Sequence, residues 1–162
     1  SLMFALRYEQ PDLAKILINK GAELDVKQQD DWTPLMFALR YNQPDNAKLL
    51  IEKGAEVNVK NKFNWTPLMF ALEYSQPDNA KLLIEKGADV NIINNEGWTP
   101  LMITLRNDQP DLAKIIIDKV KDINVINIPE VFIFHSVKIG AGDGTIKYIN
   151  LKYIFLREWG VI

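Results

Sequence analysis

The five-residue phrase WTPLM occurs three times at an interval of 33 residues, at positions 32–36, 65–69 and 98–102. A second phrase, QPD, keeps the same interval and begins at residues 10, 43, 76 and 109. Self-similarity at a fixed period of about 20–50 residues is typical of architectures in which short units stack in a line. Such a stack has a long surface rather than a deep pocket, so the sequence favours a binding protein over an enzyme.

One unit of this period predicts two short helices. Thr33 followed by Pro34 is a helix start, with a hydroxyl at the N-cap and a proline where no N–H partner is needed. A second helix is expected to begin at Pro44 and to end at Gly54, which can adopt the left-handed conformation that terminates a helix. Each unit has too few apolar side chains to fold alone, so neighbouring units must bury one another.

The phrases that recur in each unit resemble the ankyrin repeat. TPLMFAL stands at Thr33–Leu39 and Thr66–Leu72, followed by LLIEKGAEV at Leu49–Val57 and LLIEKGADV at Leu82–Val90. The resemblance implies an all-α solenoid in which helix pairs lie side by side and the loops between repeats project as fingers. It also implies that partners bind along the concave face formed by the fingers and the first helices.

We therefore expect one domain over residues 1–162. Its expected parts are a partial repeat at 1–31, repeats at 32–64, 65–97 and 98–130, and a longer, divergent terminal repeat at 131–162.

Several residues depart from the family pattern. Asn42 and Ser75 stand where the family often has glycine between the two helices, and serine tolerates a left-handed turn less well than asparagine. Asn46 and Asn79 occupy positions where an apolar side chain is expected, so we predict that both hydrogen-bond to neighbouring backbone. Val120 replaces the terminating glycine, which predicts a different end for the last helix.

The segment after residue 130 admits more than one interpretation. We favour a degenerate fifth repeat in which Thr145–Trp159 forms a long second helix and His135 has the structural role of the family's usual histidine. A β-hairpin tail packed on the stack is the alternative. The string IGAGDG also resembles the glycine-rich loop of methyltransferases, but such a loop without its strand and helix frame is weak support for a cofactor site.

Composition narrows the classes of function. The chain has no cysteine, a single histidine and a net charge of −2, and it contains no recognisable catalytic, cofactor or metal motif. We expect a non-enzyme without cofactor or metal whose partner is another protein rather than nucleic acid or a membrane. The chain is expected to be monomeric or part of a longer repeat array. No signal peptide or membrane span is evident, which favours the cytoplasm without establishing a compartment.

The candidate partner-binding residues repeat along the expected concave face. Tryptophan and tyrosine there are typical of interface hot spots, and charged residues stand beside them, with Arg7 at the first of these positions. The predicted site consists of Tyr8, Trp32, Arg40, Tyr41, Trp65, Glu73, Tyr74, Trp98 and Arg106.

Two questions stay open at this point. The tryptophans could contact a partner directly, or they could stack on neighbouring repeats and only stabilise them. The chain could be a non-catalytic scaffold, or it could be the targeting segment of a larger enzyme or secreted effector whose catalytic domain is absent from these residues.

Overall fold

A computed structural model of the chain describes residues 1–120, 137–140 and 146–149. The first of these ranges contains eight α-helices, arranged as four pairs. The helices are α1 (Leu2–Arg7), α2 (Pro11–Asn19), α3 (Pro34–Arg40), α4 (Pro44–Glu52), α5 (Pro67–Glu73), α6 (Pro77–Glu85), α7 (Pro100–Arg106) and α8 (Pro110–Lys119).

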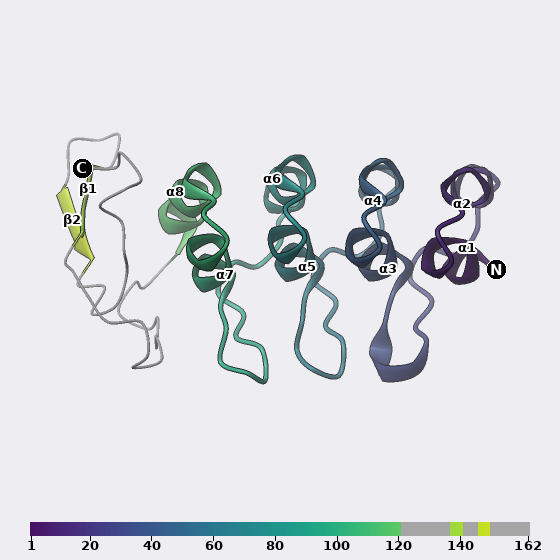
Figure 1. Ribbon diagram of the computed structural model, residues 1–162, viewed down its shortest axis with the longest axis horizontal. Helices are drawn as coiled ribbons and strands as arrows, with labels where there is room; N and C mark the ends of the chain where they lie inside the picture. Colours follow the sequence, from purple (N-terminus) through teal and green to yellow (C-terminus); the bar gives the residue numbers. More distant parts are fainter. Residues whose placement is uncertain (121–136, 141–145, 150–162) are drawn as a thin grey trace.

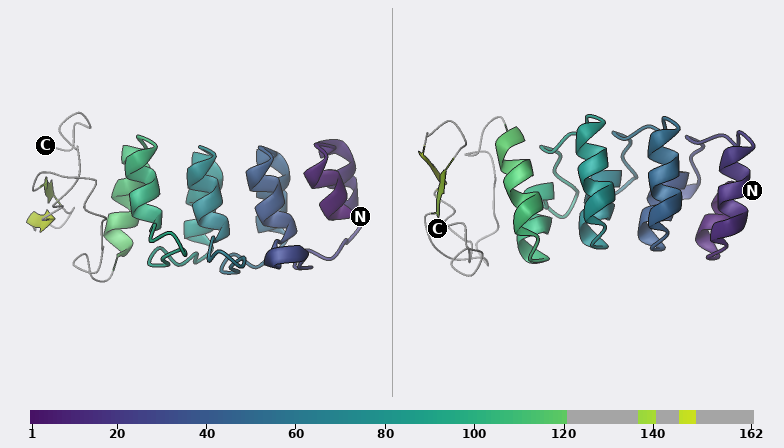
Figure 2. Two further views of the ribbon diagram at one scale, coloured as in Figure 1. Left: turned by 60° about the horizontal axis from the view of Figure 1, so that its bottom comes forward. Right: turned by 90° about the horizontal axis from the view of Figure 1, so that it is seen from above.

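The four pairs stack in a line. The first helices α1, α3, α5 and α7 form one row, the second helices α2, α4, α6 and α8 form the other, and each helix contacts its neighbours in the row (Figures 1 and 2). Three loops, at 21–33, 54–66 and 87–99, project on the same side of the first helices and are called the fingers (Figure 1). A short 3₁₀ helix, Gln29–Asp31, lies in the first finger. The expected all-α solenoid of helix pairs is confirmed.

The first helices begin where the sequence predicts. Thr33 Oγ1 accepts a hydrogen bond from the backbone N–H of Met36 at 3.4 Å, and Thr66 and Thr99 cap α5 and α7 in the same way. Behind these caps, Leu35, Met36 and Leu39 are almost fully inaccessible, as are their counterparts in the next repeat. The core is therefore one continuous layer shared between repeats, which is why no single repeat needs to be stable alone.

The turn between the two helices of a repeat needs a left-handed residue. Asn42 and Ser75 both have φ of 50°, while the glycines after the second helices, such as Gly54 at φ 90°, have larger positive values. The serine is the less suitable of the two non-glycine residues, because asparagine is enriched at positive φ and serine is not. This turn therefore stores a small amount of backbone strain at Ser75.

Replacing Ser75 with glycine is expected to raise the free energy of unfolding by about 0.5–1 kcal/mol. Relief of left-handed strain exceeds the extra entropy that glycine gains in the unfolded chain. Urea denaturation measures the change, and Asn42→Gly is the matched control, expected to give a smaller gain. A loss of stability in Ser75→Gly would contradict this account of the turn.

A repeated glutamine–asparagine couple ties each repeat to the one before it. Gln76 Nε2 donates to Leu39 O at 2.7 Å, and Asn79 Nδ2 donates to Pro44 O at 3.0 Å and to Gln76 Oε1 at 2.9 Å. The same three hydrogen bonds recur one repeat earlier, from Gln43 and Asn46. The prediction that Asn46 and Asn79 hydrogen-bond to neighbouring backbone is confirmed.

The last pair shows what the asparagine contributes. There Gln109 Nε2 still reaches Leu72 O at 2.9 Å, but leucine occupies position 112. Gln109 Oε1 is then buried without a hydrogen-bond partner among the described residues. The couple is therefore complete only in the two middle repeats.

Helix α8 ends differently from the earlier second helices, as expected. Val120 follows its last residue with φ −71° and ψ 121°, an extended conformation, whereas Lys53 after α4 stays near helical values and Gly54 turns left-handed. A β-branched residue avoids the left-handed region, so the chain leaves α8 without the usual glycine turn.

The expectation of a helical terminal repeat is wrong where the structure describes this segment. Strands β1 (Val137–Gly140) and β2 (Ile146–Ile149) pair antiparallel, with Val137 opposite Ile149. Strand β2 lies within Thr145–Trp159, for which we expected a helix, and β1 lies within the terminal repeat that we expected to be helical. The β-branched and aromatic residues of IKYI favour a strand, and the glycine-rich stretch between the strands favours a chain reversal over helix. His135, and the remainder of the expected long helix over Thr145–Trp159, lie outside the described residues.

Candidate protein-binding face

The predicted binding residues lie on the surface formed by the first helices and the fingers, called the finger-side face. Each tryptophan immediately precedes the threonine that caps a first helix. Asn61 holds Trp65 in place, because its Oδ1 accepts from the Trp65 N–H at 2.9 Å and its own N–H donates to Trp65 O at 3.1 Å. Asn94 holds Trp98 in the same way. The tryptophans are thus fixed at the base of the fingers.

The aromatic side chains form a connected row, the aromatic band, made of Trp32, Phe37, Tyr41, Trp65, Phe70 and Tyr74. Trp32 contacts Phe37 of its own repeat, with ring centroids 5.2 Å apart, and Phe70 of the next repeat, at 4.9 Å. Trp65 contacts Phe70 at 5.2 Å. Each phenylalanine stacks on the tyrosine one helical turn later, at 6.1 Å in one repeat and 6.4 Å in the next.

Sequence reasoning missed Phe37 and Phe70, which are largely buried and connect the tryptophans to the tyrosines. A signal was present, because residues four apart lie on the same side of a helix and each phenylalanine is four residues before a tyrosine.

The charged residues also link one repeat to the next. Arg40 donates to Tyr74 Oη at 2.6 Å and lies over the rings of Trp32 and Tyr74, at 5.6 and 5.8 Å from their centroids. Glu73 forms an ion pair with Arg106, whose guanidinium lies 4.6 Å from the Trp98 ring centroid. The arginine side chains of this face therefore pack against its aromatic rings.

The structure brings together most of the predicted site residues. Trp32, Trp65, Trp98, Tyr41 and Tyr74 are half-buried and pack against the core. These contacts support the stacking role of the tryptophans, while their partial exposure leaves direct contact with a partner as a prediction.

Tyr8 differs from the other tyrosines. It is 57% exposed and contacts only Phe4 and Arg7 among the ring and cation partners in the described chain. Tyr8 therefore lies at the end of the face rather than within the aromatic band.

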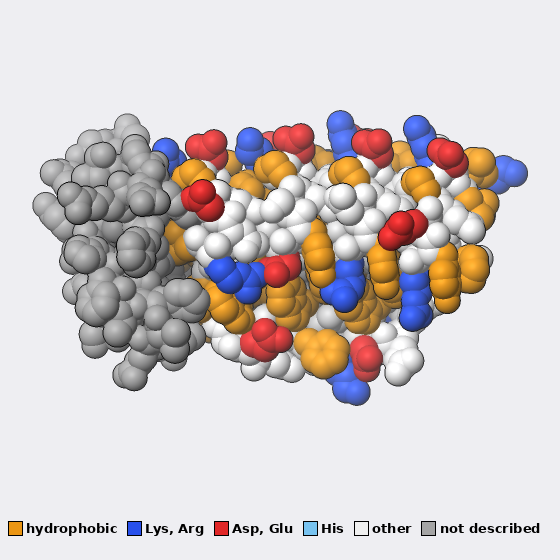
Figure 3. Space-filling view, in the orientation of Figure 1, with side chains coloured by type: hydrophobic (Ala, Val, Ile, Leu, Met, Phe, Trp, Pro, Cys, Tyr) orange, Lys and Arg blue, Asp and Glu red, His pale blue; other side chains and the backbone are white. Residues whose placement is uncertain are grey.

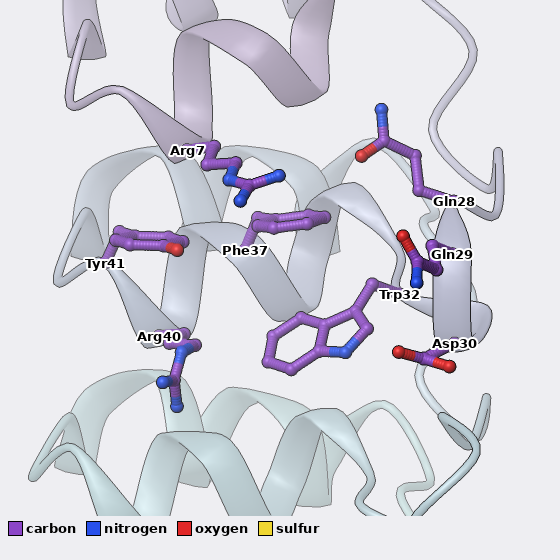
Figure 4. Close-up of a pocket in the computed structure, with 8 residues that line it drawn as sticks. All are labelled: Arg7, Gln28, Gln29, Asp30, Trp32, Phe37, Arg40 and Tyr41. Atoms are coloured by element: carbon purple, nitrogen blue, oxygen red, sulfur yellow. The ribbon is translucent and has the colours of Figure 1, made fainter.

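A hollow of about 250 Å³ opens on this face between the first two repeats (Figure 4). Arg7 and Arg40 lie at its two sides, and the rings of Phe37 and Tyr41 lie between them (Figure 4). The space-filling view shows that basic and hydrophobic side chains alternate along the middle of the face (Figure 3). The residues that line the hollow are Arg7, Gln28, Gln29, Asp30, Trp32, Phe37, Arg40 and Tyr41.

The described residues contain neither a metal-binding cluster nor a membrane-spanning helix. Among them, no group of three or more histidine, cysteine or acidic side chains is placed to hold a metal ion. No helix in this part of the chain has the length and apolar character needed to cross a membrane.

The stacked helix pairs with projecting fingers define a solenoid repeat protein, and a comparison with known families identifies which kind. The sequence model of ankyrin repeats (3 copies) matches residues 2–94 and, in a second overlapping match, residues 56–127. The chain belongs to the ankyrin repeat family. Ankyrin repeats are generally protein–protein interaction modules, and domains built from them are typically non-catalytic. No curated protein sequence matches the chain.

Proposed function

We propose that this chain is a non-catalytic scaffold that binds another protein through the finger-side face. The observation that supports the proposal is the aromatic band, which runs without interruption from Trp32 to Tyr74 and whose tryptophans and tyrosines are half-exposed. Half-exposed tryptophan and tyrosine next to arginine are the residue types that contribute most binding energy at protein interfaces. The hollow beside them provides a place where a partner side chain can be surrounded.

The opposite side of the stack has a different character. Helices α4, α6 and α8 expose mainly lysine and acidic side chains, including Lys48, Glu52 and Lys81. A hollow of about 460 Å³ lies there between α4 and α6. Exposed charges of mixed sign on helices are the ordinary solvated surface of a soluble protein, so this side serves as the internal control.

A selection for peptide ligands tests the proposal. A phage-displayed random peptide library is panned against the folded chain, and the affinities of the enriched peptides are measured by isothermal titration calorimetry. Tyr41→Ala is expected to weaken binding at least about tenfold, because the substitution removes an aromatic anchor at the edge of the hollow. Lys81→Ala on α6 is expected to leave the affinity unchanged. Affinities are corrected for the folded fraction of each variant, determined by circular dichroism.

The opposite pattern would refute the proposal. If enriched peptides lose affinity with Lys81→Ala and keep it with Tyr41→Ala, the binding face is the row of second helices. If no peptide is enriched above an unrelated control protein, the face is not a peptide-binding surface.

A further inference from the structure

Two arginines on the finger-side face have no acidic partner among the described residues. Position 7 and its equivalents one, two and three repeats later are Arg7, Arg40, Glu73 and Arg106. Glu73 and Arg106 form an ion pair with each other. Within residues 1–120, Arg7 and Arg40 form no ion pair, and their contacts are to aromatic rings and the Tyr74 hydroxyl.

These two guanidinium groups border the same hollow. Arg7 and Arg40 approach it from opposite sides, above and below the rings of Phe37 and Tyr41 in Figure 4. The single carboxylate in the lining, that of Asp30, is paired with Lys62 at 3.3 Å. The hollow is therefore a positively charged place on a chain whose net charge is −2.

The charge defines what the hollow can bind. A guanidinium group has five N–H donors, and only one donor of Arg40 is used, in its bond to Tyr74. Carboxylates and phosphates accept the remaining donors in pairs. The chain has a net charge of −2, and among the described residues only these two cations border the hollow. A ligand with two localised negative charges therefore suits the hollow better than a nucleic acid, whose binding depends on many phosphate contacts.

The spacing of the two arginines narrows the backbone conformation of the ligand. The axes of neighbouring packed helices such as α1 and α3 are about 8–10 Å apart, and this is the interval between the backbone positions that carry Arg7 and Arg40. In a polyproline II helix, residues three apart lie on the same side and are about 9 Å apart. In a β-strand, residues on the same side are about 7 or 13 Å apart, which fits this interval less well.

The aromatic rings between the arginines agree with this conformation. Proline-rich segments in the polyproline II conformation bind to grooves lined by aromatic side chains, where each ring of proline packs on an aromatic face. Tyr41 and Trp32 line the hollow and are half-exposed, so their rings offer such a surface beside the two guanidinium groups.

We propose that the hollow binds an acidic, proline-containing segment of a partner protein, in which two carboxylates three residues apart contact Arg7 and Arg40. The proposal rests on the proposed function and specifies the chemistry of its ligand. The third repeat does not extend this pattern, because Glu73 neutralises Arg106 and would repel a further carboxylate. The preferred segment thus has two acidic residues rather than a long acidic run.

Fluorescence anisotropy with synthetic peptides tests the proposal. The labelled probe PPEPPEPP is compared with PPQPPQPP, which lacks the charges, and with PPEPEPPP, which has the same composition and a two-residue spacing. PPEPPEPP is expected to bind about tenfold or more tightly than either control, because it alone places one carboxylate at each of the two guanidinium groups. Arg7→Gln and Arg40→Gln are each expected to lose about tenfold in affinity, and Lys81→Gln, which removes a positive charge from the opposite side of the stack, is the control expected to lose little.

A charge exchange separates recognition from a structural effect of Arg40. Arg40→Glu is expected to lose affinity for PPEPPEPP. It is expected to gain affinity for either PPEPPKPP or PPKPPEPP, depending on which of the two peptides places its lysine next to residue 40. Rescue of this kind cannot come from damage to the fold.

Several results would overturn the proposal. These are equal affinity for the glutamate and glutamine peptides, equal affinity for the two spacings, the same loss in Lys81→Gln as in Arg40→Gln, and no binding up to about 1 mM peptide. Tighter binding of an oligothymidine than of PPEPPEPP would show that the site recognises a nucleic acid. If the library selection still yields peptides that depend on Tyr41, the scaffold function stands and only the acidic ligand is refuted.

Discussion

Replacing Trp32 with alanine is expected to lower the free energy of unfolding by about 2–3 kcal/mol. Trp32 is the side chain that joins two repeats through rings, because it contacts both Phe37 and Phe70. Truncating a fully buried aromatic residue costs about 3–5 kcal/mol, and Trp32 is only half-buried, so its loss falls below that range. Urea denaturation followed by circular dichroism measures the change.

Two comparisons make this experiment specific. Trp32→Phe keeps a ring against Phe70 and is expected to lose less than half as much. Tyr8→Ala removes an aromatic side chain that is 57% exposed and is expected to change stability by no more than about 0.5 kcal/mol. If Trp32→Ala unfolds at the same urea concentration as the unaltered chain, the aromatic band does not hold the repeats together, and the tryptophan serves binding alone.

Replacing Asn79 with alanine is expected to destabilise the chain by about 2–3 kcal/mol. The side chain of Asn79 is 3% exposed and donates to Pro44 O and Gln76 Oε1. Its removal leaves the buried Gln76 Oε1 without a donor, at a cost of about 1–3 kcal/mol, and also breaks the bond to Pro44 O of the preceding repeat. Lys81→Ala, on the exposed side of the same helix, is the control and is expected to have little effect.

A double-mutant cycle shows whether the hydrogen bond between the two side chains is responsible. Gln76→Met removes the acceptor that Asn79 satisfies, so Asn79→Ala is expected to cost about 1 kcal/mol less in that background. Losses that simply add would mean that the couple does not act as a unit. Leu112→Asn is the converse change, since it supplies Gln109 Oε1 with the donor that the fourth pair lacks.

The repeat architecture was predictable because its signals are local and occur several times. The threonine–proline helix starts, the terminating glycines and the apolar spacing each follow from backbone chemistry, and all three agree in the repeats at 32–64 and 65–97. The buried asparagines were also predictable, because a polar residue at a core position must find a partner.

The parts that could not be predicted depend on contacts between repeats. The backbone oxygens that accept from Asn46 and Asn79 belong to the preceding repeat, so identifying them requires the position of that repeat. The contact of Trp32 with Phe70 likewise crosses from one repeat to the next. The strands β1 and β2 were misjudged because we extended the repeat pattern beyond the residues that carry it, against the β-branched and aromatic composition of IKYI.

The candidate site was predicted in outline and corrected in detail. The tryptophans, tyrosines and charged residues lie on one face as expected, yet Glu73 and Arg106 are paired with each other, and Phe37 and Phe70 complete the aromatic band. Arg7, which sequence reasoning left outside the main set, borders the hollow. Spacing along the chain places residues on a face, but it does not show which charges remain unpaired.

Hydrogen–deuterium exchange of the chain, alone and saturated with the tightest peptide from the library, tests most directly whether the stack binds along its length. The account predicts slower exchange in the fingers at 21–33 and 54–66 and in the turns at 41–43 and 74–76, with no change across α4 and α6. Slower exchange confined to α4, α6 and α8, with the fingers unaffected, would contradict it.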